Sequence, residues 1–166
     1  MARSVTPSVI FTRSGSIAGE ITRRVARALH SVDAALYRFN QLELARVLGE
    51  ASRRGLSVRL VLDRQKYEQD QTTQQLLREH ALSFRLIGGL RGSASKMHHK
   101  FVILDGETAL TGSYNWTRES EDENYDNLAI FSDPEPVAAY RAEFGLLWGQ
   151  ASPVSSVEPQ NRIRRA

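Results

Sequence analysis

Two short segments of the sequence carry residue types that are suited to chemistry on a phosphodiester. The first runs from Met97 to Asp105 and contains a histidine, a lysine and an aspartate with the spacing His-x-Lys-x4-Asp. The second follows the spacing Gly-Ser-x-Asn over residues 112–115. An imidazole acts as nucleophile or proton donor near neutral pH, and an ammonium, a hydroxyl and a carboxamide can hold phosphoryl oxygens. The combination predicts a site that attacks a phosphodiester.

Alternation of side chains along a strand selects one of two adjacent histidines. His98 and Lys100 are expected on one face of the strand and His99 on the other. We therefore expect His98 to be the reactive histidine and Lys100 to supply a positive charge for a phosphoryl oxygen. For His99 we expect packing or hydrogen bonding on the opposite face. No metal site is expected, because adjacent strand residues diverge and no Cys or His cluster joins them.

Further polar residues would complete the site. Ser113 and Asn115 can present a hydroxyl and a side-chain amide to the same oxygens, and the glycine before them allows close backbone approach. Asp126 is a candidate to accept a hydrogen bond from the far ring nitrogen of His98, which would fix the tautomer and stabilise the imidazolium. The alternative for Asp126 is a solvated place in the acidic run of residues 119–126.

The segment that leads to the first motif, residues 88–96, is rich in glycine and serine. It contains Arg91 and Lys96, which could follow a nucleic-acid backbone beside the site. A plain flexible loop is the alternative for this segment.

The hydrophobic pattern predicts the elements that position these residues. Apolar residues with helical spacing, among them Ile17, Ile21, Val25 and Leu29, predict helices at residues 17–29, 42–53, 73–80 and 136–148. Apolar and β-branched runs predict strands at residues 8–11, 32–39, 57–63, 83–87, 101–104, 108–110 and 127–131.

The order of these elements predicts the fold class. Strands and helices alternate through the first half, with a polar stretch over residues 64–73 leading into the third helix. Hairpin strands follow, and Asp105-Gly106 is the expected turn of one hairpin. We therefore expect an α/β fold with a mixed β-sheet flanked by helices.

Length and composition limit the classes of protein to which the chain can belong. The 166 residues are enough for one core, and we expect a single domain over residues 1–150 with a disordered polar and basic tail over 151–166. The 22 basic residues slightly outnumber the 19 acidic ones, which weakly favours binding to polyanionic partners. The absence of cysteine excludes disulfides and thiolate catalysis. Because no apolar run has the length of a signal peptide or membrane span, we expect a cytoplasmic protein, although a signal removed from a longer precursor is compatible with the sequence.

Three runs resemble the motifs of the phospholipase D superfamily: His98-x-Lys100-x4-Asp105, Gly112-Ser113-x-Asn115-x-Thr117 and Asn124-x-Asp126-Asn127. The resemblance covers approximately residues 9–148 and is nearest to the short, single-motif nucleases and the related mitochondrial-type proteins. It implies an α/β/α sandwich and a two-step mechanism without metal or cofactor. One motif histidine attacks phosphorus to form a phosphohistidine, and a second protonates the leaving oxygen and later activates water. It also implies that Asp105 braces the motif outside the phosphate contacts.

The motif occurs once in this chain, whereas larger members of the superfamily carry it twice. The resemblance therefore implies a homodimer in which His98, Lys100, Ser113 and Asn115 of both subunits meet across a two-fold axis, and an inert monomer. One departure is that the relatives usually have Glu-Asn where this sequence has aspartate at position 126, which is one methylene shorter.

Three functions follow from these expectations. The first is a low-specificity endonuclease that cleaves DNA or RNA, favoured by the small size and the mild basic balance. The second is a phospholipase acting on a cardiolipin-like lipid. It is disfavoured because Leu90 and Ala94 are the only apolar side chains of residues 88–96 that could contact a membrane. The third is a non-catalytic dimer that binds nucleic acid, which the intact motif residues argue against.

Overall fold

A computed structural model describes residues 8–154, which form one eight-stranded β-sheet. The strand order is β1-β7-β6-β5-β2-β3-β4-β8. β2, β3 and β4 are parallel to one another, and the other neighbouring strands are antiparallel. The strands are β1 Ser8–Phe11, β2 Ser31–Leu36, β3 Ser57–Asp63, β4 Phe84–Ile87, β5 Lys100–Leu104, β6 Thr108–Gly112, β7 Asn127–Phe131 and β8 Ser152–Pro153.

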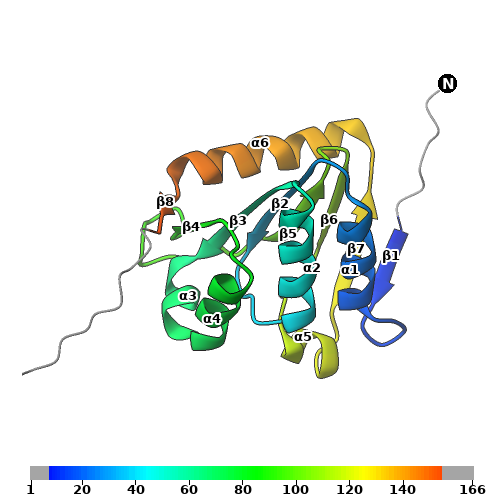
Figure 1. Ribbon diagram of the computed structural model, residues 1–166, viewed down its shortest axis with the longest axis horizontal. Coiled ribbons are helices and arrows are strands. Elements are labelled where there is room, and N and C mark those ends of the chain that lie inside the picture. The colour runs from blue at the N-terminus through cyan, green and yellow to red at the C-terminus, as the bar shows by residue number, and fades with distance from the viewer. Residues whose placement is uncertain (1–7, 155–166) are drawn as a thin grey trace, which may run out of the picture.

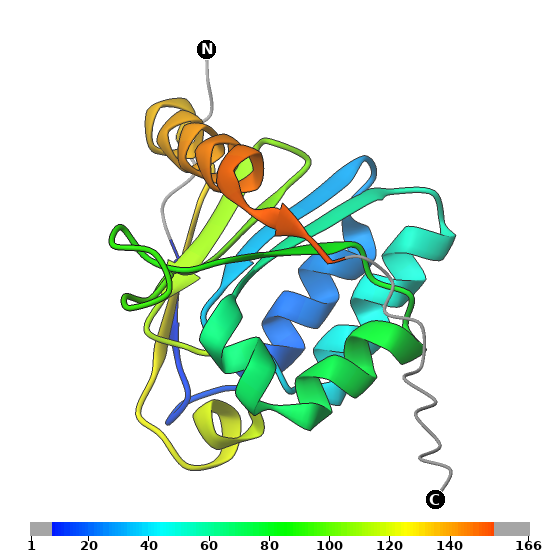
Figure 2. The ribbon, with the colours of Figure 1, turned by 90° about the vertical axis from the view of Figure 1, so that its left-hand side faces the viewer.

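Helices lie on both faces of this sheet (Figures 1 and 2). One face is covered by α1 Ile17–Arg27, α2 Leu42–Arg53, α3 Arg64–Gln69 and α4 Gln71–Glu79. The long helix α6 Pro134–Gln150 crosses the other face, and the short α5 Arg118–Asp122 lies near the end of β6. The expected α/β fold, a mixed sheet flanked by helices, is confirmed.

Two apolar cores result from the alternation of side chains along the central strands. On β5, Val102 and Leu104 belong to the larger core, under α1, α2 and α4. Phe101 and Ile103 belong to the smaller core, together with Phe144 of α6. The two faces of β5 are therefore distinct, and the residues just before this strand inherit the same alternation.

The structure corrects the predicted end of the first helix and of the second strand. Leu29 was expected in the buried stripe of the first helix, but its side chain is 74% exposed. α1 ends at Arg27, and Ala28 already has an extended backbone. The strand predicted to reach Phe39 ends at Leu36.

The polar stretch of residues 64–73 is helical, which the hydrophobic pattern did not indicate. It forms α3 and the first turn of α4. Asp63 and Asp70 cap these helices, because their carboxylates accept hydrogen bonds from the backbone N–H groups of Lys66 at 3.0 Å and Thr73 at 3.2 Å. Side-chain capping therefore specifies helices here that lack a long apolar stripe.

Residues 151–154, which were predicted to belong to a disordered tail over 151–166, are part of the folded domain. Ala151 is buried, and β8 pairs antiparallel with β4. Arg85 of β4 holds the end of α6, since its Nη1 donates to the carbonyl oxygen of Trp148 at 2.7 Å. The prediction is wrong for residues 151–154, because this segment supplies hydrogen bonds to the edge of the sheet. Residues 155–166 lie outside the described part of the chain.

The hairpin of β5 and β6 is closed by the predicted Asp105-Gly106 turn. Both residues have positive φ, 54° and 69°, as a type I′ turn requires. The Asp105 carboxylate accepts hydrogen bonds from the backbone N–H groups of Leu29, His30 and Ser31 at 2.7–3.1 Å. Burial acts to raise the pKa of Asp105, but these donors outweigh it and the pKa lies below its usual range. The contacts support the bracing role that we propose for Asp105.

We expect Asp105→Ala to lower the free energy of unfolding by about 2 kcal/mol, because three backbone donors lose a charged acceptor and alanine tolerates positive φ poorly. Asp105→Asn is the matched variant, since asparagine tolerates positive φ and keeps one acceptor oxygen. Its free energy of unfolding should therefore decrease by less than that of Asp105→Ala. Because the folded pKa is depressed, the carboxylate stabilises the fold above its unfolded pKa, and this contribution disappears as the pH falls through the folded pKa. Urea unfolding at neutral and acid pH measures both effects. A urea midpoint of unfolding for Asp105→Ala equal to that of the wild type would contradict the bracing role.

Candidate functional site

The two motifs meet at one edge of the sheet, which we call the motif edge. His98 precedes β5, Ser113 and Asn115 follow β6, and Asp126 precedes β7. Since β5, β6 and β7 are antiparallel neighbours, the start of β5, the end of β6 and the start of β7 lie together. β2 borders β5 on its other side and brings Tyr37, the residue after its last, to the same edge.

His98 is exposed and packs against a buried aromatic ring. The ring centroids of His98 and Tyr37 are 4.4 Å apart. Lys100 Nζ lies 3.4 Å from each ring nitrogen of His98 and donates to the His98 carbonyl oxygen at 2.8 Å. Imidazole and ammonium therefore lie side by side, as the strand alternation predicts.

The surroundings lower the pKa of His98. Desolvation is the largest cause, followed by the positive charges of Lys100 and Lys96, while the charge of Asp63 acts in the opposite direction. A lowered pKa keeps the imidazole neutral, which is its nucleophilic form. Burial also lowers the pKa of Lys100, and Asp126 opposes this shift.

His99 faces α6, on the opposite side of the sheet from His98. Its Nε2 lies 3.0 Å from Glu143 Oε1. The centroid of its ring is 5.4 Å from that of Phe101, which belongs to the core under α6. The expectation that His99 packs and bonds on the opposite face agrees with these contacts.

Ser113 and Asp126 are hydrogen-bonded to each other. Ser113 Oγ donates to Asp126 Oδ1 at 2.6 Å, and it accepts from the backbone N–H and Nδ2 of Asn127 at 3.1 and 3.2 Å. The structure records no hydrogen bond between Asp126 and His98 in the described part of the chain, so the partner expected for Asp126 is corrected to Ser113. The short aspartate side chain reaches the hydroxyl directly across the β6–β7 pair.

The second motif is held by close backbone packing. A Cβ added at Gly112 would lie 2.1 Å from the carbonyl oxygen of Asn127, so no larger residue fits there. Asn115 Oδ1 is buried and has no hydrogen-bond partner within residues 8–154. This carbonyl oxygen can therefore accept a hydrogen bond from a donor that enters the site.

The structure adds two residues that the sequence motifs did not include, Tyr37 and Asp63. Asp63 is 1% exposed, and its Oδ2 accepts a hydrogen bond from the backbone N–H of Met97 at 2.9 Å. The same carboxylate caps α3, so it fixes the residue before His98 to a helix terminus. An aspartate between a strand and a polar stretch is a capping signal that could have been found. Tyr37 has no such signal, because its contact with His98 depends on the pairing of β2 with β5.

Three lysines surround the Tyr37 ring. The Nζ atoms of Lys66, Lys96 and Lys100 lie 5.7, 5.9 and 5.1 Å from its centroid. The structure therefore brings Lys96 to the site. Arg91 lies in an exposed turn, where its backbone N–H donates to Ser95 Oγ at 2.8 Å. No contact of the Arg91 side chain with this lysine cluster is recorded among the described residues.

Residues 8–154 contain no group of three or more histidine, aspartate and glutamate side chains that could hold a metal ion. Across the same residues, none of the helices has the length and apolar character needed to cross a membrane.

Comparison with known proteins identifies the family. Residues 21–148 match the family described as "Cardiolipin synthase, PLD-like domain". The match covers most of the chain and includes every residue of the motif edge. The chain belongs to the phospholipase D superfamily.

Curated relatives include the mitochondrial cardiolipin hydrolases of Danio rerio, 32% identical over 125 residues, and Homo sapiens, 31% identical over 138 residues. These matches cover 75% and 83% of this chain but 54% and 53% of the relatives, so the chain spans about half their length.

Solved structures show the same fold. The phospholipase D family member Nuc from Salmonella typhimurium is 22% identical with a TM-score of 0.79, and NucT from Helicobacter pylori is 21% identical with the same score. Each comparison covers 90% of this chain and 99% of the other.

Proposed function

We propose that this protein hydrolyses phosphodiesters without a metal ion and that its substrate is nucleic acid. One observation carries the proposal: the His98 imidazole lies 3.4 Å from the Lys100 ammonium at the edge where Ser113 and Asn115 also lie. In this proposal His98 attacks phosphorus, so that an N–P bond forms as the P–O bond to the leaving group breaks. Lys100 and the polar groups after β6 hold the phosphoryl oxygens.

The leaving oxygen needs a proton, and this chain offers no second imidazole for it at the motif edge. The chain has four histidines. His99 faces α6, and His30 and His80 precede β2 and β4 at the opposite edge of the sheet. We therefore propose that His98 of the partner subunit in a homodimer is the proton donor, and that it then activates the water that hydrolyses the phosphohistidine.

Exposed side chains near the site support a nucleic-acid substrate. The three lysines around Tyr37 suit a phosphate backbone. On the other side of the site, Phe11 and Tyr125 are 53% and 90% exposed and line a hollow beside Asp126. Exposed aromatic rings next to basic groups are typical of surfaces that stack the bases of single strands.

A cardiolipin-like lipid is the second candidate substrate, because the curated relatives are named cardiolipin hydrolases. Leu90, at the turn of the loop before the motif, is fully exposed and could touch a lipid surface. The polar surroundings of His98 favour nucleic acid over this alternative.

We expect the purified protein to cleave a single-stranded oligonucleotide in excess EDTA. The same preparation should release little phosphatidic acid from cardiolipin vesicles. Both substrates are assayed side by side, with His98→Asn as the blank that corrects for contaminating nucleases. Abolition of cleavage by EDTA would contradict the metal-independent mechanism, and hydrolysis of vesicles alone would make the lipid the substrate.

A further inference from the structure

A cavity of about 230 Å³ lies beside the motif edge. It is located where β2 and β3 end and α3 and α4 begin, and its lining includes Tyr37, Tyr67 and Lys66. The carboxyl ends of parallel strands are the usual place for a ligand in open α/β sheets. Tyr37 connects this cavity to the site, because the same ring packs against His98.

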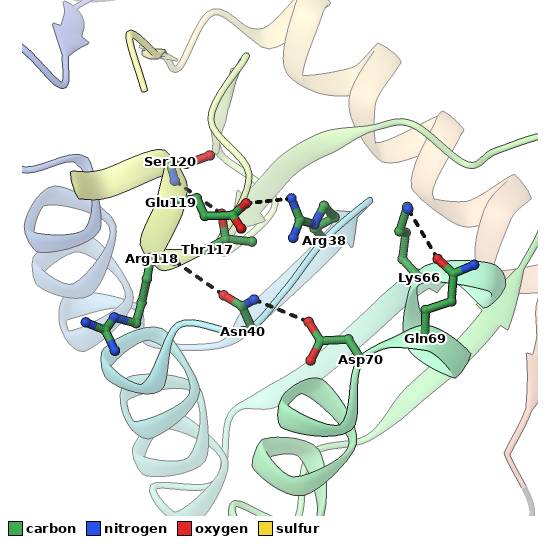
Figure 3. Close-up of polar contacts among 9 residues, drawn as sticks. All are labelled: Arg38, Asn40, Lys66, Gln69, Asp70, Thr117, Arg118, Glu119 and Ser120. Carbon is green, nitrogen blue, oxygen red and sulfur yellow. Dashed lines mark hydrogen bonds and ion pairs between the residues drawn. The ribbon is translucent and has the colours of Figure 1, made fainter. Parts of the chain in front are cut away.

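The cavity has a polar side formed by the end of α3 and the start of α4 (Figure 3). Asp70 Oδ2 accepts a hydrogen bond from Asn40 Nδ2 at 3.2 Å, and Oδ1 accepts one from the backbone N–H of Thr73. Lys66 Nζ donates to Gln69 Oε1 at 3.3 Å. An ionised carboxylate offers about four acceptor positions, so Asp70 can accept further hydrogen bonds from a ligand.

We propose that this cavity receives the nucleobase next to the scissile phosphate and that Asp70 selects a base bearing an amino group. The inference rests on the proposed function and deepens it by naming a preference. The volume is below the 300–1,000 Å³ that is typical of sites for larger ligands, so it suits a single ring system rather than an acyl chain. Tyr37 and Tyr67 supply aromatic walls for stacking. Because a carboxylate only accepts hydrogen bonds, it favours adenine, cytosine and guanine, whose exocyclic amino groups donate, over uracil and thymine, whose one ring donor, N3–H, lies between two carbonyl oxygens.

The charges around the cavity favour different places for the base and for the phosphate of a nucleotide. The ammonium groups of Lys66, Lys96 and Lys100 surround Tyr37, the ring that both lines the cavity and packs against His98, and a phosphate would bind beside them. Lys66 also lines the cavity, and the other basic residue of the lining, Arg38, is paired with Glu119 at 2.8 Å. At the end of the cavity that Asp70 forms, a phosphate would be repelled by the carboxylate, whereas a base can donate a hydrogen bond to it. A nucleobase is therefore the occupant that this distribution favours over a lipid phosphate.

Binding of nucleoside 5′-monophosphates, followed by backbone amide NMR of the whole protein, tests the inference. We expect the amides of Gln69, Asp70 and Thr73 to shift with AMP, CMP and GMP, with a Kd at least about fivefold below that of UMP. Asp70→Asn should abolish this preference while still capping α4, because asparagine is also a strong N-cap residue. Glu68→Gln is the matched control, since it removes the same charge from an exposed position of α3 outside the cavity lining and should keep the preference.

A phosphodiester without a base, bis(4-nitrophenyl) phosphate, separates this inference from the proposed function. Its turnover by the wild type tests the phosphodiesterase chemistry, and the control variant Glu68→Gln should leave that turnover unchanged. The base preference is measured by binding, so it is decided even if the protein cleaves nothing. Equal affinity for CMP and UMP, or a preference retained in Asp70→Asn, would overturn the inference. Larger shifts with glycerol 3-phosphate than with any nucleotide would identify the cavity as a headgroup site instead.

Discussion

His98→Asn is expected to reduce phosphodiester cleavage by at least about 10⁴-fold, because asparagine has no nitrogen that can attack phosphorus or carry a proton. The imidazole is the only one of this chain at the motif edge, so no neighbouring histidine can replace it. His98 is exposed, so the substitution leaves no cavity in the core. The fold should therefore survive with a thermal midpoint close to that of the wild type. Initial rates on bis(4-nitrophenyl) phosphate, with thermal unfolding of the same samples, measure both quantities.

His99→Asn is the matched control for this experiment. It makes the same chemical change one residue away, on the face that contacts Glu143 and α6. Its activity should remain within a few-fold of the wild type, although loss of the exposed contact with Glu143 costs up to about 1 kcal/mol of stability. If His99→Asn were inactive and His98→Asn active, the assignment of the reactive histidine by strand alternation would be wrong.

The choice of His98 over His99 shows which parts of the site can be predicted from the sequence alone. The spacing of His98 and Lys100 determines that they share a face, and the pairing of β5 with neighbours on both sides preserves this relation. The Asp105-Gly106 turn was equally local, because only a few residue types tolerate positive φ at both positions. Local rules of this kind also predicted most strands, since apolar and β-branched residues dominate the buried ones.

The remaining features depend on contacts between distant segments. Tyr37 reaches His98 only because β2 lies beside β5, and nothing near Tyr37 in the sequence indicates this. His98 was the partner predicted for Asp126, but the pairing of β6 with β7 places Ser113 within its reach instead. The helix α3 was missed for a local reason, because capping by Asp63, rather than an apolar stripe, specifies where it begins. Such hydrogen bonds contribute stability without leaving a periodic pattern in the sequence.

The shared-site proposal predicts how mixtures of wild type and His98→Asn behave. If the nucleophile and the proton donor come from different copies, a dimer with one His98 lacks one of the two groups and is nearly inactive. After random exchange at equal amounts, only about a quarter of the dimers carry both histidines, so the activity should fall to about a quarter of that of the same total amount of wild-type protein. Activity as a function of the wild-type fraction should then follow a square rather than a straight line.

Two observations decide whether that curve reports a shared site. Light scattering must give a dimer for the wild type, the variant and the mixture, since the square law requires pairs. Mixtures with His99→Asn should keep nearly full activity, because that residue lies on the opposite face from His98 in each copy. A linear fall to about half at equal amounts would mean that each copy acts alone. Lys100 would then be the strongest remaining candidate for the proton donor, because its Nζ lies 3.4 Å from the His98 ring and its pKa is lowered by burial.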